Sequence, residues 1–362
     1  MTGLRMASIR ALCVVAVATL PIMASAAEPR AKAPASPQIV VKRGAATVQT
    51  RAGTLQGLVR NGVSTFRGIP YATAERFEQP VPAKAWTGTR LALSYGNICP
   101  QPIETTFREP QAFVSDWKFW PASENCLNLN VWTPKADARK RPVMVWLHGG
   151  GFFSGSSIEL PYYDGENLSR RGDVVVVSVN HRLNALGFMD LSAYGEPYRA
   201  SGNVGMADLV AALKWVRDNA AAFGGDPDNV TIFGKSGGGG KVVTLLAAPA
   251  AKGLFHKSIV MSGVMGPPEG RAIDQRVARR VAALTFKHAG LREGDIERLR
   301  ELPYDQLTAA GNKALEEAGR ETGASGMLPG FPRVMWGPVH DRAFPNGHST
   351  GPRRRSRRTC RC

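Results

Sequence analysis

The sequence predicts an α/β fold in which a mostly parallel central sheet is flanked by helices. Three observations predict it. Short apolar runs rich in β-branched residues recur along the chain, a segment with helical periodicity lies between two of them, and glycine-rich turns follow two of them. Strands that alternate with helices need crossover connections, which give parallel strands covered on both faces. A length of 362 residues with 43% apolar content provides enough core for one large domain.

Each element of this prediction has its own sequence signal. Residues 203–223 have apolar side chains at helical spacing, and the turn sequence at 224–227 should end that helix. Residues 46–66 predict an antiparallel hairpin region with a turn at Asn61-Gly62. The expected core strands are 143–147, 174–179, 230–233 and 258–261.

The most informative motif follows the strand at 230–233. Residues 234–238 read Gly-Lys-Ser-Gly-Gly and fit G-x-S-x-G, and a helix-compatible stretch at 241–248 comes next. A strand, a sharp turn and a helix form the nucleophile elbow, which exposes the serine hydroxyl above the sheet. Glycine is needed two residues on either side because the turn leaves no room for a Cβ. Ser236 is thus a candidate nucleophile, and a glycine-rich turn that only connects strand to helix is the alternative.

A second glycine-rich segment strengthens this interpretation. The strand at 142–147 ends in His-Gly-Gly-Gly-Phe, residues 148–152. Three glycines let backbone N–H groups turn toward one point, where they can stabilise the oxyanion of an acyl-transfer transition state. A flexible loop is the alternative. Both motifs follow strands, where ligands bind in such sheets, and together they indicate a serine hydrolase of the α/β-hydrolase type.

The N-terminus is predicted to be a signal peptide, residues 1–26. Arg5 and Arg10 precede a short apolar core at 11–20, and residues 24–26 form an A-x-A cleavage site. An N-terminal core helix is the alternative. Residues 27–46 are expected to be a disordered mature N-terminus because their first part is rich in Pro and Ala. We therefore expect export to the periplasm or the medium.

The net charge of +17 is uneven. Without the six arginines of the tail and the two of the signal peptide it is +9. Because no nucleic-acid motif is present, we exclude nucleic-acid binding as the function. No apolar run of about 20 residues follows the N-terminus, so no membrane span is expected. No metal-ligand constellation or phosphate-binding loop is evident, so we expect neither a metal nor another cofactor.

Two cysteines lie inside the predicted folded region, Cys99 and Cys126. A disulfide between them would close a loop of about 28 residues and stabilise the fold by roughly 3–4 kcal/mol. Two free thiols are the alternative. Cys13 would leave with the signal peptide, and Cys360 and Cys362 lie in the tail.

Several distinctive segments follow one another in a fixed order. They are residues 66–72 (FRGIPYA), 123–132 (SENCLNLNVW), 148–152 (HGGGF), 180–183 (NHRL), Gly202-Asn203 with Asp208, 223–227 (FGGDP), and the elbow around Ser236. With these segments the chain resembles, from about residue 48 to about 340, the type-B carboxylesterase family, which includes cholinesterase-like enzymes. The ordered combination is highly specific, and Asn125 stands where the family usually has Asp.

The resemblance implies a role for each matching residue. Ser236 would form the acyl-enzyme, and the backbone N–H groups of Gly150, Gly151 and Gly237 would form the oxyanion hole. Cys99 and Cys126 match the family's N-terminal disulfide. The elbow differs from the common G-E-S-A-G-G at Lys235 and Gly237. Gly237 keeps the N–H donor, whereas the sequence does not reveal the effect of Lys235 on substrate preference.

The sequence does not identify a general base for the serine. We interpret His148, His181, His256 and His288 as structural or surface residues. In the family the acid and the histidine lie well downstream of the serine, which implies an acid near or beyond residue 360 and a histidine past residue 362. The Arg-rich segment 341–362 departs from the family, and our hypothesis is a reading-frame shift near codon 340. The domain expected is thus the N-terminal portion of the hydrolase, residues 47–340.

The prediction is an exported serine carboxylesterase that hydrolyses small-molecule carboxylic esters through an acyl-enzyme on Ser236. Two alternatives remain open. One is a truncated remnant with little activity, and the other is a non-catalytic binding protein on the hydrolase scaffold. The intact elbow and glycine loop favour the enzyme, because a binding protein needs neither. The sequence does not predict the oligomeric state.

Overall fold

The computed structural model describes residues 38–42, 44–102, 120–263, 273–323 and 334–341. The predicted signal peptide, the segment 27–37 and the tail from residue 342 lie outside the described residues. The domain boundaries expected at both ends therefore stay predictions.

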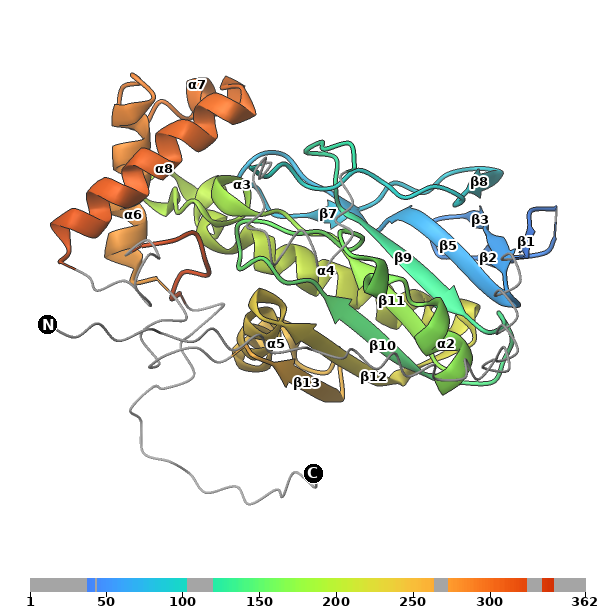
Figure 1. The fold of residues 1–362 in the computed structure, drawn as a ribbon. Helices are drawn as coiled ribbons and strands as arrows, with labels where there is room; N and C mark the ends of the chain where they lie inside the picture. The colour runs from blue at the N-terminus through green and yellow to red at the C-terminus, as the bar shows by residue number, and fades with distance from the viewer. Residues whose placement is uncertain (1–37, 43, 103–119, 264–272, 324–333, 342–362) are drawn as a thin grey trace, which may run out of the picture. The chain divides into compact units, whose positions relative to one another are not determined.

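The described strands and α-helices follow in chain order (Figure 1). The strands are β1 (Ile39–Val40), β2 (Thr47–Gln49), β3 (Thr54–Gln56), β4 (Leu58–Arg60), β5 (Val63–Pro70), β6 (Ala72–Thr73), β7 (Val81–Pro82), β8 (Thr89–Leu91), β9 (Asn128–Thr133), β10 (Arg141–Leu147), β11 (Val175–Val179), β12 (Gly225–Lys235) and β13 (Lys257–Met261). The helices are α2 (Glu166–Gly172), α3 (Asn184–Phe188), α4 (Val204–Asn219), α5 (Gly237–Ala247), α6 (Gln275–His288), α7 (Ile296–Glu301) and α8 (Tyr304–Glu321).

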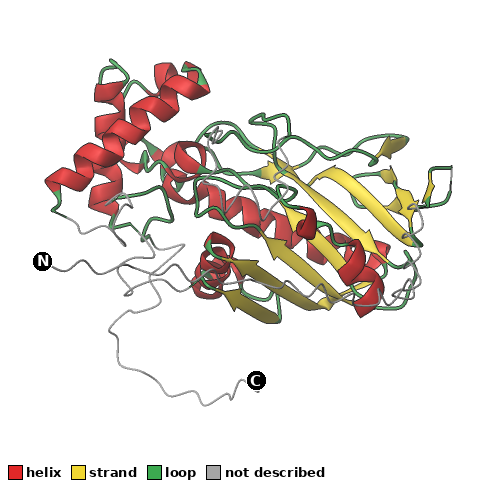
Figure 2. Ribbon diagram, in the orientation of Figure 1, coloured by secondary structure: helices red, strands yellow, loops and turns green. Residues whose placement is uncertain are grey.

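An eight-stranded sheet forms the centre, in the order β1-β4-β5-β9-β11-β10-β12-β13 (Figure 2). β11, β10, β12 and β13 pair in parallel, and β1, β4, β5 and β9 pair antiparallel. The predicted α/β class, with a central sheet and flanking helices, is confirmed. The sheet is mixed, and its parallel part holds all four predicted core strands.

Strand β11 is buried on both faces along its length, as its run of β-branched apolar residues predicts, whereas β13 at the sheet edge is largely exposed. In β11, Val175, Val177 and Val179 belong to the main core, whereas Val176 joins a second cluster on the other face. Helix α4 packs into the main core and α2 contacts β9 and β11 on the opposite face (Figure 1). The side chains of β11 alternate between the two faces because successive residues of a strand point to opposite sides of the sheet.

The predicted long helix is confirmed as α4, which continues into a 3₁₀ turn at Ala220–Phe223. Gly224 ends it in the left-handed conformation, with φ 77°. The predicted hairpin turn is also confirmed. It joins β4 to β5 through Asn61 and Gly62, whose φ angles are 50° and 81°.

Two elements differ from the sequence prediction. Strand β1 lies within the segment 27–46, which we expected to be disordered. Its two β-branched residues form a strand because they pair with β4 at the sheet edge. Helix α5 begins at Gly237, four residues before the predicted start at 241. Glycine disfavours helix, but close packing of these glycines against neighbouring backbone overrides that preference.

Helices α6 and α8 pack against each other next to α7 (Figure 1). Asp274 and Asp295 cap α6 and α7 by accepting N–H hydrogen bonds. None of the helices in the described ranges is long and apolar enough to cross a membrane.

Candidate active site

Ser236 lies in the turn between β12 and α5, at the C-terminal end of a parallel strand. Its backbone has φ 57° and ψ −123°, a conformation that costs a non-glycine residue about 1–3 kcal/mol. Its N–H donates to the carbonyl of Met261 on β13 at 2.8 Å, and its carbonyl accepts from the N–H of Gly240 at 3.0 Å. The neighbouring strand and the first turn of α5 thus hold the serine in this strained turn.

The glycines two residues before and after Ser236 are required by contact. A Cβ at Gly234 would lie 2.5 Å from the carbonyl carbon and oxygen of Gly238. A Cβ at Gly238 would lie 2.1 Å from the carbonyl oxygen of Leu147, the last residue of β10. The turn therefore has the close backbone approach that the sequence motif predicts.

Residues 148–151, called the glycine loop below, lie against this turn. Gly150 and Gly151 have φ angles of 80° and 61°, which glycine adopts without strain. A Cβ at Gly237 would lie 2.3 Å from the backbone nitrogen of Gly151. The missing side chain at 237 lets the two backbones touch, and the predicted oxyanion residues are thereby brought together.

The backbone N–H groups of these glycines are available as donors. Among the described turns and loops, no backbone–backbone hydrogen bond is donated by Gly150, Gly151 or Gly237. Gly237 opens α5, where N–H groups lack intrahelical partners and the helix dipole favours negative charge. The arrangement can receive a developing oxyanion beside Ser236.

His148 and His181 are buried supports of the loop. Their rings stack with centroids 5.1 Å apart. Nδ1 of His148 lies 2.9 Å from the Gly149 carbonyl, and Nδ1 of His181 lies 2.8 Å from the Arg182 carbonyl. Burial, followed by the nearby charge of Lys241, holds the pKa of both rings well below the usual value. Both are therefore neutral, with the Nδ1–H groups donating to carbonyls.

The rings of His256 and His288 also form hydrogen bonds with groups other than Ser236. Nδ1 of His256 accepts the N–H of Val230 at 3.1 Å, and Nε2 of His288 lies 2.8 Å from a carboxylate oxygen of Glu317. These contacts agree with the structural or surface roles predicted for them.

No hydrogen bond between described residues joins a histidine ring to the hydroxyl of Ser236. The backbone N–H of His340 donates to the Ile273 carbonyl at 3.0 Å, and His348 lies outside the described residues. In the described ranges, no cluster of three or more His, Cys, Asp or Glu side chains forms a metal site.

A buried cation that the sequence did not predict lies beneath the glycine loop. Lys241 is fully buried on α5, and its Nζ donates to the carbonyls of His148 at 2.8 Å and Gly149 at 3.4 Å. Burial lowers its pKa to about 7, and the charge of Glu159 opposes that shift. The available signal was a lone lysine preceding the apolar residues of a helix that starts at the nucleophile elbow.

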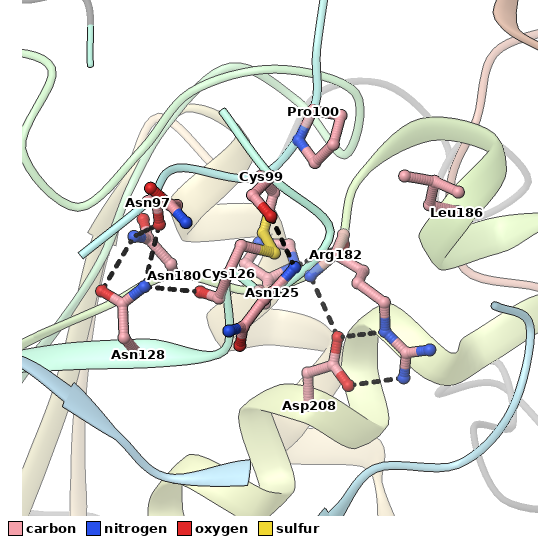
Figure 3. The surroundings of a disulfide bond; sticks show 12 residues. Asn97, Cys99, Pro100, Asn125, Cys126, Asn128, Asn180, Arg182, Leu186 and Asp208 are labelled. Carbon is pink, nitrogen blue, oxygen red and sulfur yellow. Dashed lines mark hydrogen bonds and ion pairs between the residues drawn. A yellow bond between two sulfur atoms is a disulfide. The ribbon is translucent and has the colours of Figure 1, made fainter. Parts of the chain in front are cut away.

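Cys99 and Cys126 form a disulfide, with Cα atoms 5.0 Å apart (Figure 3). Gln101, two residues beyond Cys99, accepts from the N–H of Gly155 at 2.6 Å and donates to its carbonyl at 3.0 Å. The segment that carries the disulfide therefore supports the chain just after the glycine loop.

Arg182 and Asp208, from two of the motifs, form a buried ion pair (Figure 3). The guanidinium donates to the carboxylate at 2.7 and 2.9 Å, and the backbone N–H of Arg182 donates at 3.0 Å. Asp208 has no exposed surface. Such a charge-assisted, bidentate contact fixes the loop after β11 against α4.

Comparison with known proteins agrees with this geometry. The chain is 42% identical to para-nitrobenzyl esterase of Bacillus subtilis over 74% of its length and 52% of that enzyme's. It is 40% identical to phenmedipham hydrolase of Pseudarthrobacter oxydans over 71% of its length and 50% of that protein's. The chain thus spans about half the length of these curated relatives.

A solved structure gives the same result. An esterase from Clostridium hathewayi, described as hydrolysing aliphatic aromatic polyesters, superposes with a TM-score of 0.77 at 45% identity. The match covers 85% of this chain and 59% of that one. The sequence model of the carboxylesterase family matches residues 44–356. The chain therefore belongs to the carboxylesterase family.

Proposed function

We propose that this protein hydrolyses carboxylic esters through an acyl-enzyme on Ser236. The serine Oγ attacks the ester carbonyl, and its proton passes through a general base to the departing alcohol. The new C–O bond to serine forms as the bond to the alkoxy group breaks. Water then attacks the acyl-enzyme, which releases the carboxylic acid and restores the hydroxyl.

One observation carries this proposal, namely the backbone contact between Gly237 and Gly151 beside a strained serine. This contact supports the proposal because it brings the backbone of the glycine loop against the start of α5, the helix that follows Ser236. If Gly149 carried a Cβ, that atom would lie 3.9 Å from the Cβ of Ser236. Gly149 therefore lies close to the serine side chain. Donors fixed in advance around a growing oxyanion give the largest rate contribution in acyl transfer.

Small esters with an aromatic group are the substrates we propose to test first. The names of two relatives, a para-nitrobenzyl esterase and an esterase described as hydrolysing aliphatic aromatic polyesters, point to aromatic groups in the substrates of those proteins. This chain shares 42% and 45% identity with them over the part that it matches.

Export is also proposed, from the charge, apolar core and cleavage site of residues 1–26. The intact mass of the protein exported by its own host tests this. Cleavage after Ala26 gives a first residue of Ala27, whereas retention of residues 1–26 in the cell fraction contradicts export.

The test of the nucleophile uses the same host-produced protein and para-nitrophenyl butyrate. Ser236→Ala should lower hydrolysis by about 10³-fold or more, because the covalent route through the serine is lost. Ser258→Ala, an exposed serine on β13, is the matched control. Hydrolysis that survives Ser236→Ala unchanged would exclude Ser236 as the nucleophile.

A further inference from the structure

Lys241 occupies an unusual place for a lysine. Its side chain is fully buried, and its Nζ lies against the first two carbonyls of the glycine loop. The Phe152 ring, just after the loop, has its centroid 6.0 Å from Nζ. A buried cation is costly unless polar groups receive its hydrogen bonds, and here the loop backbone receives them.

One of these bonds acts on a peptide group that presents a predicted oxyanion donor. The carbonyl of Gly149 belongs to the same peptide unit as the N–H of Gly150. That carbonyl accepts from Lys241 at 3.4 Å and from Nδ1 of His148 at 2.9 Å. Donors on the carbonyl side fix the plane of the peptide and polarise its N–H, because hydrogen bonds in a chain strengthen one another.

We propose that Lys241 is a positioning residue that holds the glycine loop so that its N–H groups face the reacting carbonyl. The proposal rests on the ester hydrolysis proposed for Ser236. Lys241 acts through the loop, since its Nζ bonds to two loop carbonyls, and that of Gly149 lies opposite the N–H of Gly150 in one peptide unit. Its charge also favours the negative charge that develops in the transition state.

Charged and titratable groups face Lys241 from several elements. His148 and His181 lie just after β10 and β11. After burial, the charge of Lys241 is the next cause that lowers the pKa of each ring. Glu159 attracts it, and burial raises the pKa of that carboxyl while Lys241 and Lys235 oppose the rise. The Tyr163 hydroxyl donates to Glu159 at 3.3 Å. The lysine is therefore the main cation of a buried cluster under the loop.

The hold on the loop depends on pH. Burial places the pKa of Lys241 at about 7, so it is an ammonium below that pH and an amine above it. The ammonium is the stronger donor. We expect kcat to lose part of its value as pH rises through about 7, in addition to any dependence on the general base.

The experiment compares wild type, Lys241→Met, Lys241→Gln and Lys214→Met. Lys214 is exposed on α4 and serves as the matched control. Glutamine keeps an uncharged donor on a side chain that is one bond shorter. kcat and KM for para-nitrophenyl butyrate are measured from pH 5.5 to pH 9, and hydrogen exchange is measured for peptides that contain the glycine loop.

For Lys241→Met we expect kcat to fall by about tenfold or more, less than for loss of a whole oxyanion donor, with KM changed less than about twofold. The fall near pH 7 should disappear in both Lys241 variants. Exchange of the glycine loop should accelerate about tenfold, as for one lost hydrogen bond, in Lys241→Met and not in Lys214→Met.

The two measurements separate this proposal from the proposed function. Unchanged exchange of the loop in Lys241→Met overturns the positioning role. Faster exchange with an unchanged kcat and pH profile overturns its link to catalysis. If wild type hydrolyses no ester but the loop of Lys241→Met exchanges faster, ester hydrolysis fails while the hold on the loop stands.

Discussion

Replacing Lys241 by Met should change the sign of its effect on stability between acid and alkaline pH. The pKa of this lysine falls from 10.5 to about 7 in the folded protein. The difference between these two pKa values corresponds to about 5 kcal/mol. Between pH 7 and pH 10.5 the unfolded chain binds more protons than the folded one, so stability rises with pH in that window. Below pH 7 the full cost of the buried ammonium is present.

The methionine removes this cost but loses hydrogen bonds. The carbonyl of His148 loses a donor at 2.8 Å, which costs about 1–3 kcal/mol for a buried group, and Glu159 loses a nearby cation. The difference of these terms makes Lys241→Met more stable than wild type by about 2–4 kcal/mol at pH 6. Near pH 10 only about 1 kcal/mol of the charge contribution remains, and the variant should be less stable by up to about 2 kcal/mol.

Equilibrium urea unfolding at pH 6 and pH 10 measures this difference. With a urea dependence of about 3 kcal/mol per molar, the midpoint should rise by about 1 M at pH 6 and fall at pH 10. Lys214→Met should leave the midpoint nearly unchanged at both pH values. Lys214 is exposed, so its charge is solvated in the folded and in the unfolded protein. An effect of Lys241→Met with one sign and one size at both pH values would refute the reasoning.

Two further predictions concern the supports around the site. Asp208→Asn should destabilise the protein by about 3–5 kcal/mol in urea unfolding, because Arg182 then remains buried without its carboxylate; a loss below about 1 kcal/mol would contradict a buried ion pair. Replacing Cys99 and Cys126 together by Ser should cost about 3–4 kcal/mol, since the bond spans 27 positions of the sequence. Unchanged unfolding in oxidising buffer would mean that the disulfide does not form.

Local patterns were sufficient for the elements that carry the site. The β-branched run of β11 and the helical spacing of α4 each reflect interactions within a few residues. The elbow was predictable because a sharp turn excludes a Cβ at fixed positions around Ser236, and the glycine contacts show that exclusion directly. Backbone sterics act over short sequence distances, so the sequence displays them.

Contacts between distant segments were not predictable in this way. The early start of α5 at Gly237 depends on packing against β10 and the glycine loop. The burial of Lys241 likewise depends on carbonyls more than 90 positions earlier in the chain. A lysine in a short helix gives no sign of its partner.

By itself, the sequence determined the α/β class, the candidate nucleophile and the family, because each depends on ordered local motifs. Only the tertiary structure decided that His148 and His181 are neutral supports of the glycine loop, and that a titratable lysine lies beneath that loop. Burial and hydrogen bonding set the charge of these groups. Both depend on which segments the fold brings together, and neither is encoded in the neighbours of a residue along the chain.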